Sequence, residues 1–149
     1  MGLLTDAFIA TEEELAAVLS KDYFNPISFF PTMQSKNIDI FMLTTLEAIV
    51  IQEEFPSINA SIETIQERIT GEYDGPWIYR LPDTLVERLA NLTSAEVIHN
   101  GQAWGAAIQH DYEKHPPDVS GIVPYLQELC QLAKHPSLER KHMYMWMSL

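Results

Sequence analysis

The C-terminal segment from His142 to Leu149 places the strongest constraint on the fold, because sulfur-containing and aromatic side chains alternate along it with almost no charge. Chain ends usually fray and are polar, so an end this apolar is expected to pack against the body of the protein or a partner. If this segment is a strand, Met143, Met145 and Met147 lie on one face of it. Tyr144 and Trp146 then lie on the opposite face. We expect it to pair with residues 29–30 or 77–79 and to lie under helices.

Most of the remaining chain has helical periodicity. Apolar side chains recur at helical spacing in six segments, over residues 12–20, 38–54, 58–69, 81–90, 94–112 and 122–134. The second of these is apolar on most sides, which is typical of a central helix covered by its neighbours. The sequence therefore predicts a mainly α protein, with five to six helices in one compact domain over residues 1–149 and a small β element that includes the C-terminal stretch.

Local signals mark two helix starts and one close helix contact. Thr11 with Glu14 and Thr93 with Glu96 have the spacing of capping boxes. Gly101 and Gly105 lie inside the fifth expected helix, where each glycine costs about 1 kcal/mol relative to alanine. We expect another helix to cross closely at these two positions.

The region between residues 22 and 80 is less regular. Four isoleucines at spacings of four, three and four predict a helix over 58–69 that is apolar on one narrow side and ends at Gly71. Because isoleucine is β-branched, a strand is the alternative for this segment. Asp74 to Pro76 is expected to be a turn followed by an extended piece over 77–80. Residues 22–36 are expected to form a loop, with a short strand at 28–30.

Composition indicates a cytoplasmic protein. The single cysteine, Cys130, excludes an internal disulfide framework and a cysteine-based zinc site, and we expect a buried thiol of little reactivity. The first residues lack the basic region of a secretory signal. The longest apolar region, 38–51, contains interrupting polar residues and is too short to cross a bilayer, so no membrane association is expected.

Charge is concentrated in the first half of the chain. Residues 1–75 carry thirteen acids against three bases, whereas residues 76–149 carry eight against six, giving the total of −12. A field of this sign repels phosphate backbones, so nucleic-acid binding is disfavoured. It favours a partner protein with a basic surface.

No set of residues predicts a catalytic or metal centre. The histidine-rich segment from His110 to His115 divides between two sides of a helix, and the His110 and Glu113 side chains share one of them. Two Glu-x-x-His pairs, Glu96–His99 and Glu139–His142, have the spacing of di-iron ligands. Glu96 already has a capping role, and the second pair lies beside Pro136 outside a long helix, so we expect neither a metal nor a cofactor.

The second half resembles a group of small, uncharacterised bacterial proteins. The residues that carry this resemblance are Leu81-Pro82, Leu85-Val86 and Leu89-Ala90, then Trp104, and the ending Met143-Tyr144-x-Trp146-Met147-Ser148-Leu149. The resemblance implies a bacterial cytosolic setting, and it implies no activity.

Two functional hypotheses follow. The first is a non-catalytic acidic interaction protein, such as an immunity-type inhibitor or an adaptor, with Trp77, Tyr79 and Arg80 in the contact because aromatic residues and arginine dominate interface hot spots. The alternative is a small-molecule enzyme or sensor with a pocket near Gly101 and Trp104, where His99 or His110, with Glu113, would supply acid–base chemistry. A homodimer joined through the apolar tail is compatible with both.

Overall fold

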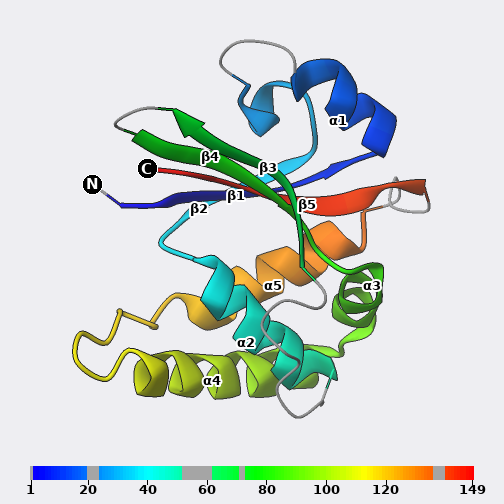
Figure 1. The fold of residues 1–149 in the computed structure, drawn as a ribbon. Coiled ribbons are helices and arrows are strands. Elements are labelled where there is room, and N and C mark those ends of the chain that lie inside the picture. The colour runs from blue at the N-terminus through cyan, green and yellow to red at the C-terminus, as the bar shows by residue number, and fades with distance from the viewer. Residues whose placement is uncertain (1, 20–23, 52–61, 71–72, 136–139) are drawn as a thin grey trace.

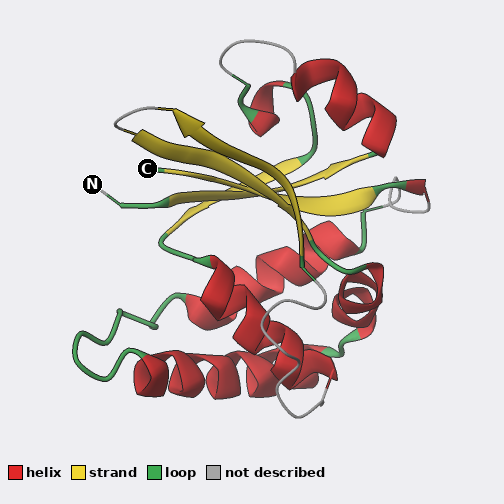
Figure 2. Cartoon of the chain, viewed as in Figure 1, coloured by secondary structure: helices red, strands yellow, loops and turns green. Residues whose placement is uncertain are grey.

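A five-stranded antiparallel sheet divides the molecule into two layers (Figure 1). The computed structural model describes residues 2–19, 24–51, 62–70, 73–135 and 140–149. Four helices lie on one side of the sheet, and one helix with a short 3₁₀ turn lies on the other, as Figure 2 shows by colour. We call these the helical face and the far face.

The strands are β1 (Leu4–Ala10), β2 (Thr32–Lys36), β3 (Glu63–Thr70), β4 (Tyr73–Arg80) and β5 (His142–Ser148). The helical face carries α2 (Ile40–Ile51), α3 (Asp83–Asn91), α4 (Ser94–Asp111) and α5 (Ile122–Ala133). The far face carries α1 (Glu12–Leu19) and the 3₁₀ turn η1 (Pro26–Ser28). The strand order is β2-β1-β5-β4-β3, so the two ends of the chain lie side by side at the centre of the sheet.

The expectation of a mainly α protein is wrong, because five strands form a complete sheet. The sequence analysis assigned no element to residues 4–10, which are β1 and pair with both β2 and β5. The isoleucine-rich segment expected to be a helix supplies β3 over 63–70, and its first residues, 58–61, lie outside the described residues. Its β-branched side chains suit a strand once β4 is there to pair with it.

Two smaller expectations between residues 22 and 80 are also wrong. The short strand expected at 28–30 is displaced to 32–36, and Pro26 begins η1 just before it. The turn expected over 74–76 lies within β4, while the extended piece over 77–80 is confirmed as the last half of that strand. Because strand ends depend on a partner strand, local turn residues such as Gly75 did not locate them.

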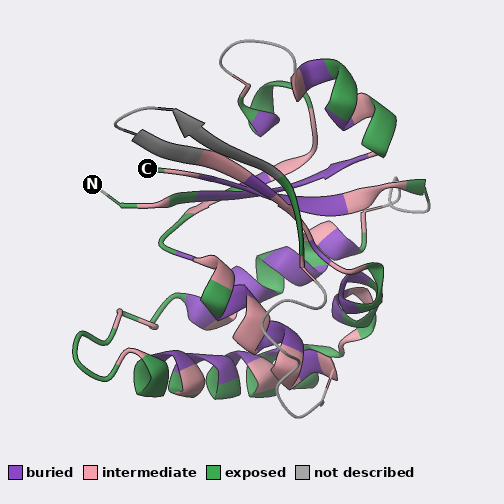
Figure 3. Cartoon of the chain, in the orientation of Figure 1, coloured by how far each residue is buried: buried purple, intermediate pink, exposed green. Residues whose placement is uncertain are grey.

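The β5 strand confirms the predicted alternation. Met143, Met145 and Met147 are at most 3% exposed and pack under the helices, whereas Tyr144 and Trp146 pack on the far face. The strand pairs with the expected residues 77–79, and also with Arg80, but its other partner is β1 rather than residues 29–30. Figure 3 shows β1 and β5 as buried along most of their length.

Both capping boxes and the close helix crossing are confirmed. The backbone N–H of Glu14 donates to Thr11 Oγ1 and that of Thr11 to Glu14 Oε1, each at 3.1 Å, and Thr93 with Glu96 repeats this pattern. A Cβ atom added at Gly101 would lie 2.9 Å from Val123 Cγ2 on α5. Two helices can approach this closely only where one of them lacks a side chain.

Candidate functional site

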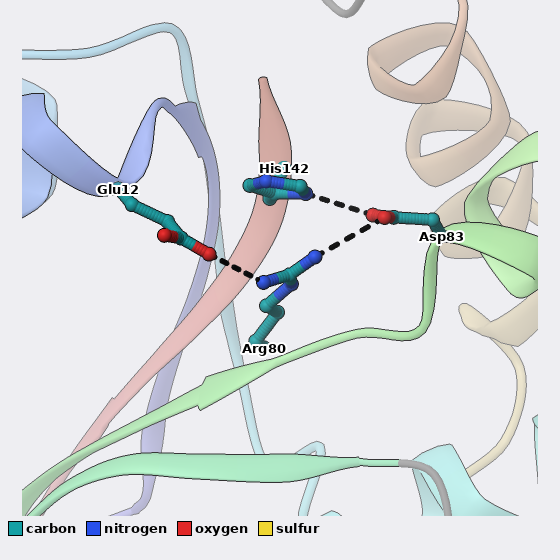
Figure 4. Close-up of polar contacts among 4 residues, drawn as sticks. All are labelled: Glu12, Arg80, Asp83 and His142. Atoms are coloured by element: carbon teal, nitrogen blue, oxygen red, sulfur yellow. Dashed lines mark hydrogen bonds and ion pairs between the residues drawn. The ribbon is translucent and has the colours of Figure 1, made fainter. Parts of the chain in front are cut away.

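Four polar side chains converge at one end of the sheet (Figure 4). Arg80 donates from Nη1 to Glu12 Oε1 at 2.8 Å and from Nη2 to Asp83 Oδ2 at 3.1 Å. His142 Nδ1 lies 2.8 Å from the other oxygen of the same carboxylate, Asp83 Oδ1. A carboxylate only accepts hydrogen bonds, so Nδ1 carries the proton in this contact. We call these four residues the charged cluster.

The fold brings the charged cluster together from four separate elements. Glu12 is the first residue of α1, Arg80 ends β4, Asp83 begins α3 and His142 begins β5. The antiparallel pairing of β4 with β5 brings the end of one strand next to the start of the other. Carboxylates in the first turn of a helix also interact favourably with the positive end of its dipole. The cluster therefore links the far-face helix to the helical layer.

A cleft of about 720 Å³ lies beside the charged cluster. It is lined by side chains from α3, α5 and the start of β5: Asp83, Val86, Glu87, Ala133, Arg140, Lys141 and His142. Lys141 Nζ forms a further ion pair with Glu14 Oε1 at 3.3 Å. Charges of both signs thus continue from the cluster along the edge of the cleft.

The surroundings shift the pKa values of three groups in this region. Partial burial raises the pKa of Asp83, but hydrogen bonding and charge from His142 and Arg80 outweigh it and hold the pKa below its usual value. The backbone N–H of Thr11 lowers the pKa of Glu14, with help from Lys141. Burial raises the pKa of the Tyr144 hydroxyl. The site therefore favours ionised carboxylates near neutral pH.

Among the described residues that we group at this end of the sheet, carboxylates outnumber cations. We define the acidic rim as six carboxylates with the cations among them: Glu12, Glu13, Glu14, Glu63, Asp83 and Glu87, with Arg80, Arg140 and Lys141. Glu63 belongs to it because it is the register partner of Arg80. The rim has three excess negative charges when His142 is neutral. Within the described part of the chain, Glu13, Glu63 and Glu87 are exposed and form no ion pair.

Of the three residues expected to contact a partner, one lies in the rim. Arg80 is at its centre. Trp77 and Tyr79 are half-buried, and their side chains pack against the core of the helical face. They lie on the helical face because they pair in register with Met147 and Met145 of β5. The aromatic pair therefore belongs mainly to the core.

The four residues of the alternative pocket are not brought together into one site. Trp104 is fully buried, and its Nε1–H donates to the carbonyl oxygen of Met42 at 2.8 Å, whereas His99 and His110 are exposed. His110 and Glu113 line a shallow depression of about 420 Å³ at the end of α4. Trp104 is not among the residues that line this depression. Trp104 acts as a core residue in this arrangement.

The candidates for metal binding and for thiol chemistry were the two Glu-x-x-His pairs and Cys130. Among the residues that the structure describes, no three histidine, cysteine or acidic side chains are placed to hold a metal ion. Glu139 of the second Glu-x-x-His pair lies outside those residues. Burial raises the pKa of the Cys130 thiol to about 11. In the same described ranges, no helix combines the length and hydropathy needed to cross a bilayer.

Sequence reasoning did not find the charged cluster, although it had considered two of its members separately. Arg80 was a candidate for the partner contact, and His142 belonged to a Glu-x-x-His pair considered for metal binding. The sequence contained one indication of the cluster, which is the spacing of Arg80 and Asp83. These two residues flank a Leu-Pro step between an expected extended segment and an expected helix. Comparison with protein-family models, curated proteins and solved structures gives no match for this chain.

Proposed function

We propose that this protein is a non-catalytic interaction protein that binds a basic partner protein through the acidic rim, as an immunity-type inhibitor or an adaptor does. The observation that carries the proposal is the set of exposed carboxylates without ion-pair partners among the described residues. Glu13, Glu63 and Glu87 come from three elements that meet at one end of the sheet. Their charge is available to lysine and arginine side chains of another protein.

The charged cluster supports binding rather than catalysis. Both oxygens of Asp83 are occupied by Arg80 and His142, and Glu12 accepts from the other end of the same guanidinium. These contacts hold the elements around the rim in fixed positions. A fixed array of charges loses less conformational freedom on binding than a mobile one, and it steers a basic partner during encounter.

The alternative function, a small-molecule enzyme or sensor that uses His99 or His110, has weaker support. Both imidazoles are exposed, and Trp104 is committed to the core between α4 and α2. General acid–base catalysis needs the titrating group within hydrogen-bond reach of a bound substrate. Neither histidine lines a cavity together with Trp104 in the part of the chain that the structure describes.

Charge reversal at the rim tests the proposal. The variant combines Glu13→Lys, Glu63→Lys and Glu87→Lys, none of which removes an ion pair between described residues. The matched control makes the same change of charge away from the rim, with Asp111→Lys, Glu113→Lys and Glu128→Lys. Each tagged protein is used to capture partners from the source cells at low salt, where the screening length is about 10 Å or more.

We expect one or more basic proteins to be retained by the wild type and the control variant and lost by the rim variant. Retention should also fall as salt rises, because the contact is between exposed charges. Circular dichroism spectra establish that all three proteins are folded. Equal retention by the rim variant and the control, or retention that does not depend on salt, would contradict the proposal.

A further inference from the structure

The cleft of about 720 Å³ beside the charged cluster has two walls that carry charges of opposite sign. On one wall, α3 contributes Asp83 and Glu87, which lie one helical turn apart on the same side of the helix. The other wall is the chain that leads into β5, and it contributes Arg140, Lys141 and His142. An acidic wall therefore faces a basic wall across the cleft.

Three of the five polar side chains in these walls already have partners within the protein. Asp83 accepts from both Arg80 and His142, and its contact of 2.8 Å with His142 joins the two walls directly. Lys141 is paired with Glu14 on α1, at 3.3 Å. These contacts leave two charged side chains in the cleft.

The two remaining side chains are those of Glu87 and Arg140. Both residues are exposed, and neither forms an ion pair with a residue that the structure describes. They line the same cleft from opposite walls, but the carboxylate and the guanidinium do not approach each other to within 4.0 Å. One negative and one positive charge therefore border the space between them. A ligand with a single charge would complement only one of these two groups.

The lining between the two charged groups is apolar. Val86 of α3 is 5% exposed and Ala133 of α5 is 4% exposed, and both line the cleft. A short hydrocarbon chain can lie against these side chains while its charged ends reach the two walls. Ligand sites typically combine an apolar surface with a few polar groups that fix the orientation of the ligand.

We propose that this cleft binds a small zwitterion, which is a molecule with an ammonium group and a carboxylate group joined by a short hydrocarbon chain, as in an amino acid. Glu87 binds the ammonium group, and Arg140 binds the carboxylate, whose two oxygens match the parallel N–H donors of a guanidinium. Val86 and Ala133 contact the hydrocarbon chain. The site goes beyond the proposed partner binding, although it shares Glu87 and Arg140 with the acidic rim.

Three probes with the same number of carbon atoms test whether both charges are needed. δ-Aminovalerate carries both charges, valerate carries only the negative charge, and pentylamine carries only the positive charge. Binding to the purified full-length protein is followed by NMR of alanine methyl groups at an ionic strength of about 0.1 M, where the screening length is about 10 Å. The Ala133 methyl group reports on the cleft, and that of Ala106, which is exposed on α4 and outside the cleft lining, is the control.

We expect δ-aminovalerate to shift the Ala133 resonance and to leave that of Ala106 unmoved. Its Kd should be at least about threefold lower than that of either probe with one charge, which is within the range for one exposed ion pair. Glycine, γ-aminobutyrate and ε-aminocaproate are measured in the same way, because the separation of the ligand's charges must match that of the two walls. The zwitterion with the lowest Kd is then compared with the carboxylate and the amine of its own chain length.

Two variants assign the ends of the ligand. Glu87→Gln should weaken the binding of the zwitterion and of the amine by about threefold and leave the binding of the carboxylate unchanged. Arg140→Gln should weaken the binding of the zwitterion and of the carboxylate by a similar factor and leave the binding of the amine unchanged. The matched controls are Glu113→Gln, just after α4, and Arg88→Gln, which is exposed on α3 and outside the cleft lining. Both controls should bind all probes as the wild type does.

A carboxylate or an amine that binds as tightly as the zwitterion of the same chain length would overturn the requirement for two charges. Weaker binding of the same probes in both variants, instead of opposite ones, would overturn the assignment of the ends. If no zwitterion of the series moves the Ala133 methyl resonance in the wild type, the cleft is not a ligand site. No partner protein is present in these measurements, so their failure is separate from a failure of the acidic rim to bind its partner.

Discussion

The two faces of the sheet are covered in different ways. On the helical face, four helices bury a large core of aliphatic and methionine side chains. On the far face, α1 and η1 cover a smaller core with an aromatic centre, where the Phe8 ring stacks on Phe30 and Tyr144 with centroids 5.4 Å apart. The same strand, β5, supplies residues to both. The difference indicates that the helical layer carries most of the stability and that α1 is a smaller unit added to the sheet.

The charged cluster lies where the two layers meet, because Glu12 belongs to the far-face helix and Asp83 belongs to the helical layer. Arg80 lies between them and binds both carboxylates. The rim is therefore held in place by both layers. Four predictions test this comparison, in order of decreasing expected effect.

The largest effect is expected on the helical face. Trp104→Ala removes a fully buried indole that donates to the carbonyl oxygen of Met42, and it should lower the free energy of unfolding by about 3–5 kcal/mol. Urea denaturation measures this loss. Trp104→Phe retains most of the volume and should cost less. Equal losses for the two variants would show that packing of the indole is not what joins α4 to α2.

A smaller loss is expected on the far face. Leu15→Ala truncates a side chain of α1 that is 2% exposed, and we expect a loss of about 2 kcal/mol, at the low end of the range for buried leucines. Amide hydrogen exchange should accelerate in α1 but not in α4 or α5, because the helix detaches without global unfolding. Leu15→Met is the volume-conserving control. Acceleration throughout the molecule would contradict the division into two units.

A methyl group added at Gly101 should destabilise the folded protein, because it would lie in the contact between α4 and α5. Gly101→Ala would bring a Cβ atom to 2.9 Å from Val123 Cγ2 and 3.3 Å from its Cα, and overpacking of this kind costs about 1–3 kcal/mol. The gain of about 1 kcal/mol in helix propensity offsets part of this cost. Thermal unfolding of Gly121→Ala provides the control, because that glycine has φ of −92° and nothing within 4 Å of the added atom. A neutral Gly101→Ala would mean that Val123 can move away.

The smallest effect is expected where the two layers meet. Because the pKa of Asp83 is lowered in the folded protein, its contribution to stability is present above its usual pKa near 3.8 and is lost as pH falls through the lowered value. Asp83→Asn should therefore cost less than about 1 kcal/mol at pH 7, since this side chain is 60% exposed. Melting temperatures of the variant and the wild type should converge in acid. A constant difference at all pH values would contradict an electrostatic origin.

Predictions from the sequence succeeded where the responsible contacts are local. The starts of α1 and α4 are fixed by the threonine–glutamate pairs Thr11–Glu14 and Thr93–Glu96, which need no other part of the chain. They failed for β1 and β3, because the partners that make these segments strands lie far away in the sequence. The charged cluster was missed for the same reason, since Glu12 and Arg80 are 68 positions apart.

The sequence by itself determined which side chains of β5 lie on each face of the sheet, and where α1 and α4 begin. It did so because side-chain periodicity is a property of the local backbone, as the alternation of Met145 and Trp146 in β5 illustrates. Only the tertiary structure decided that a sheet exists, and which carboxylates meet Arg80 at its end. Hydrogen bonds between strands, and ion pairs between elements, form only after distant segments have been brought together.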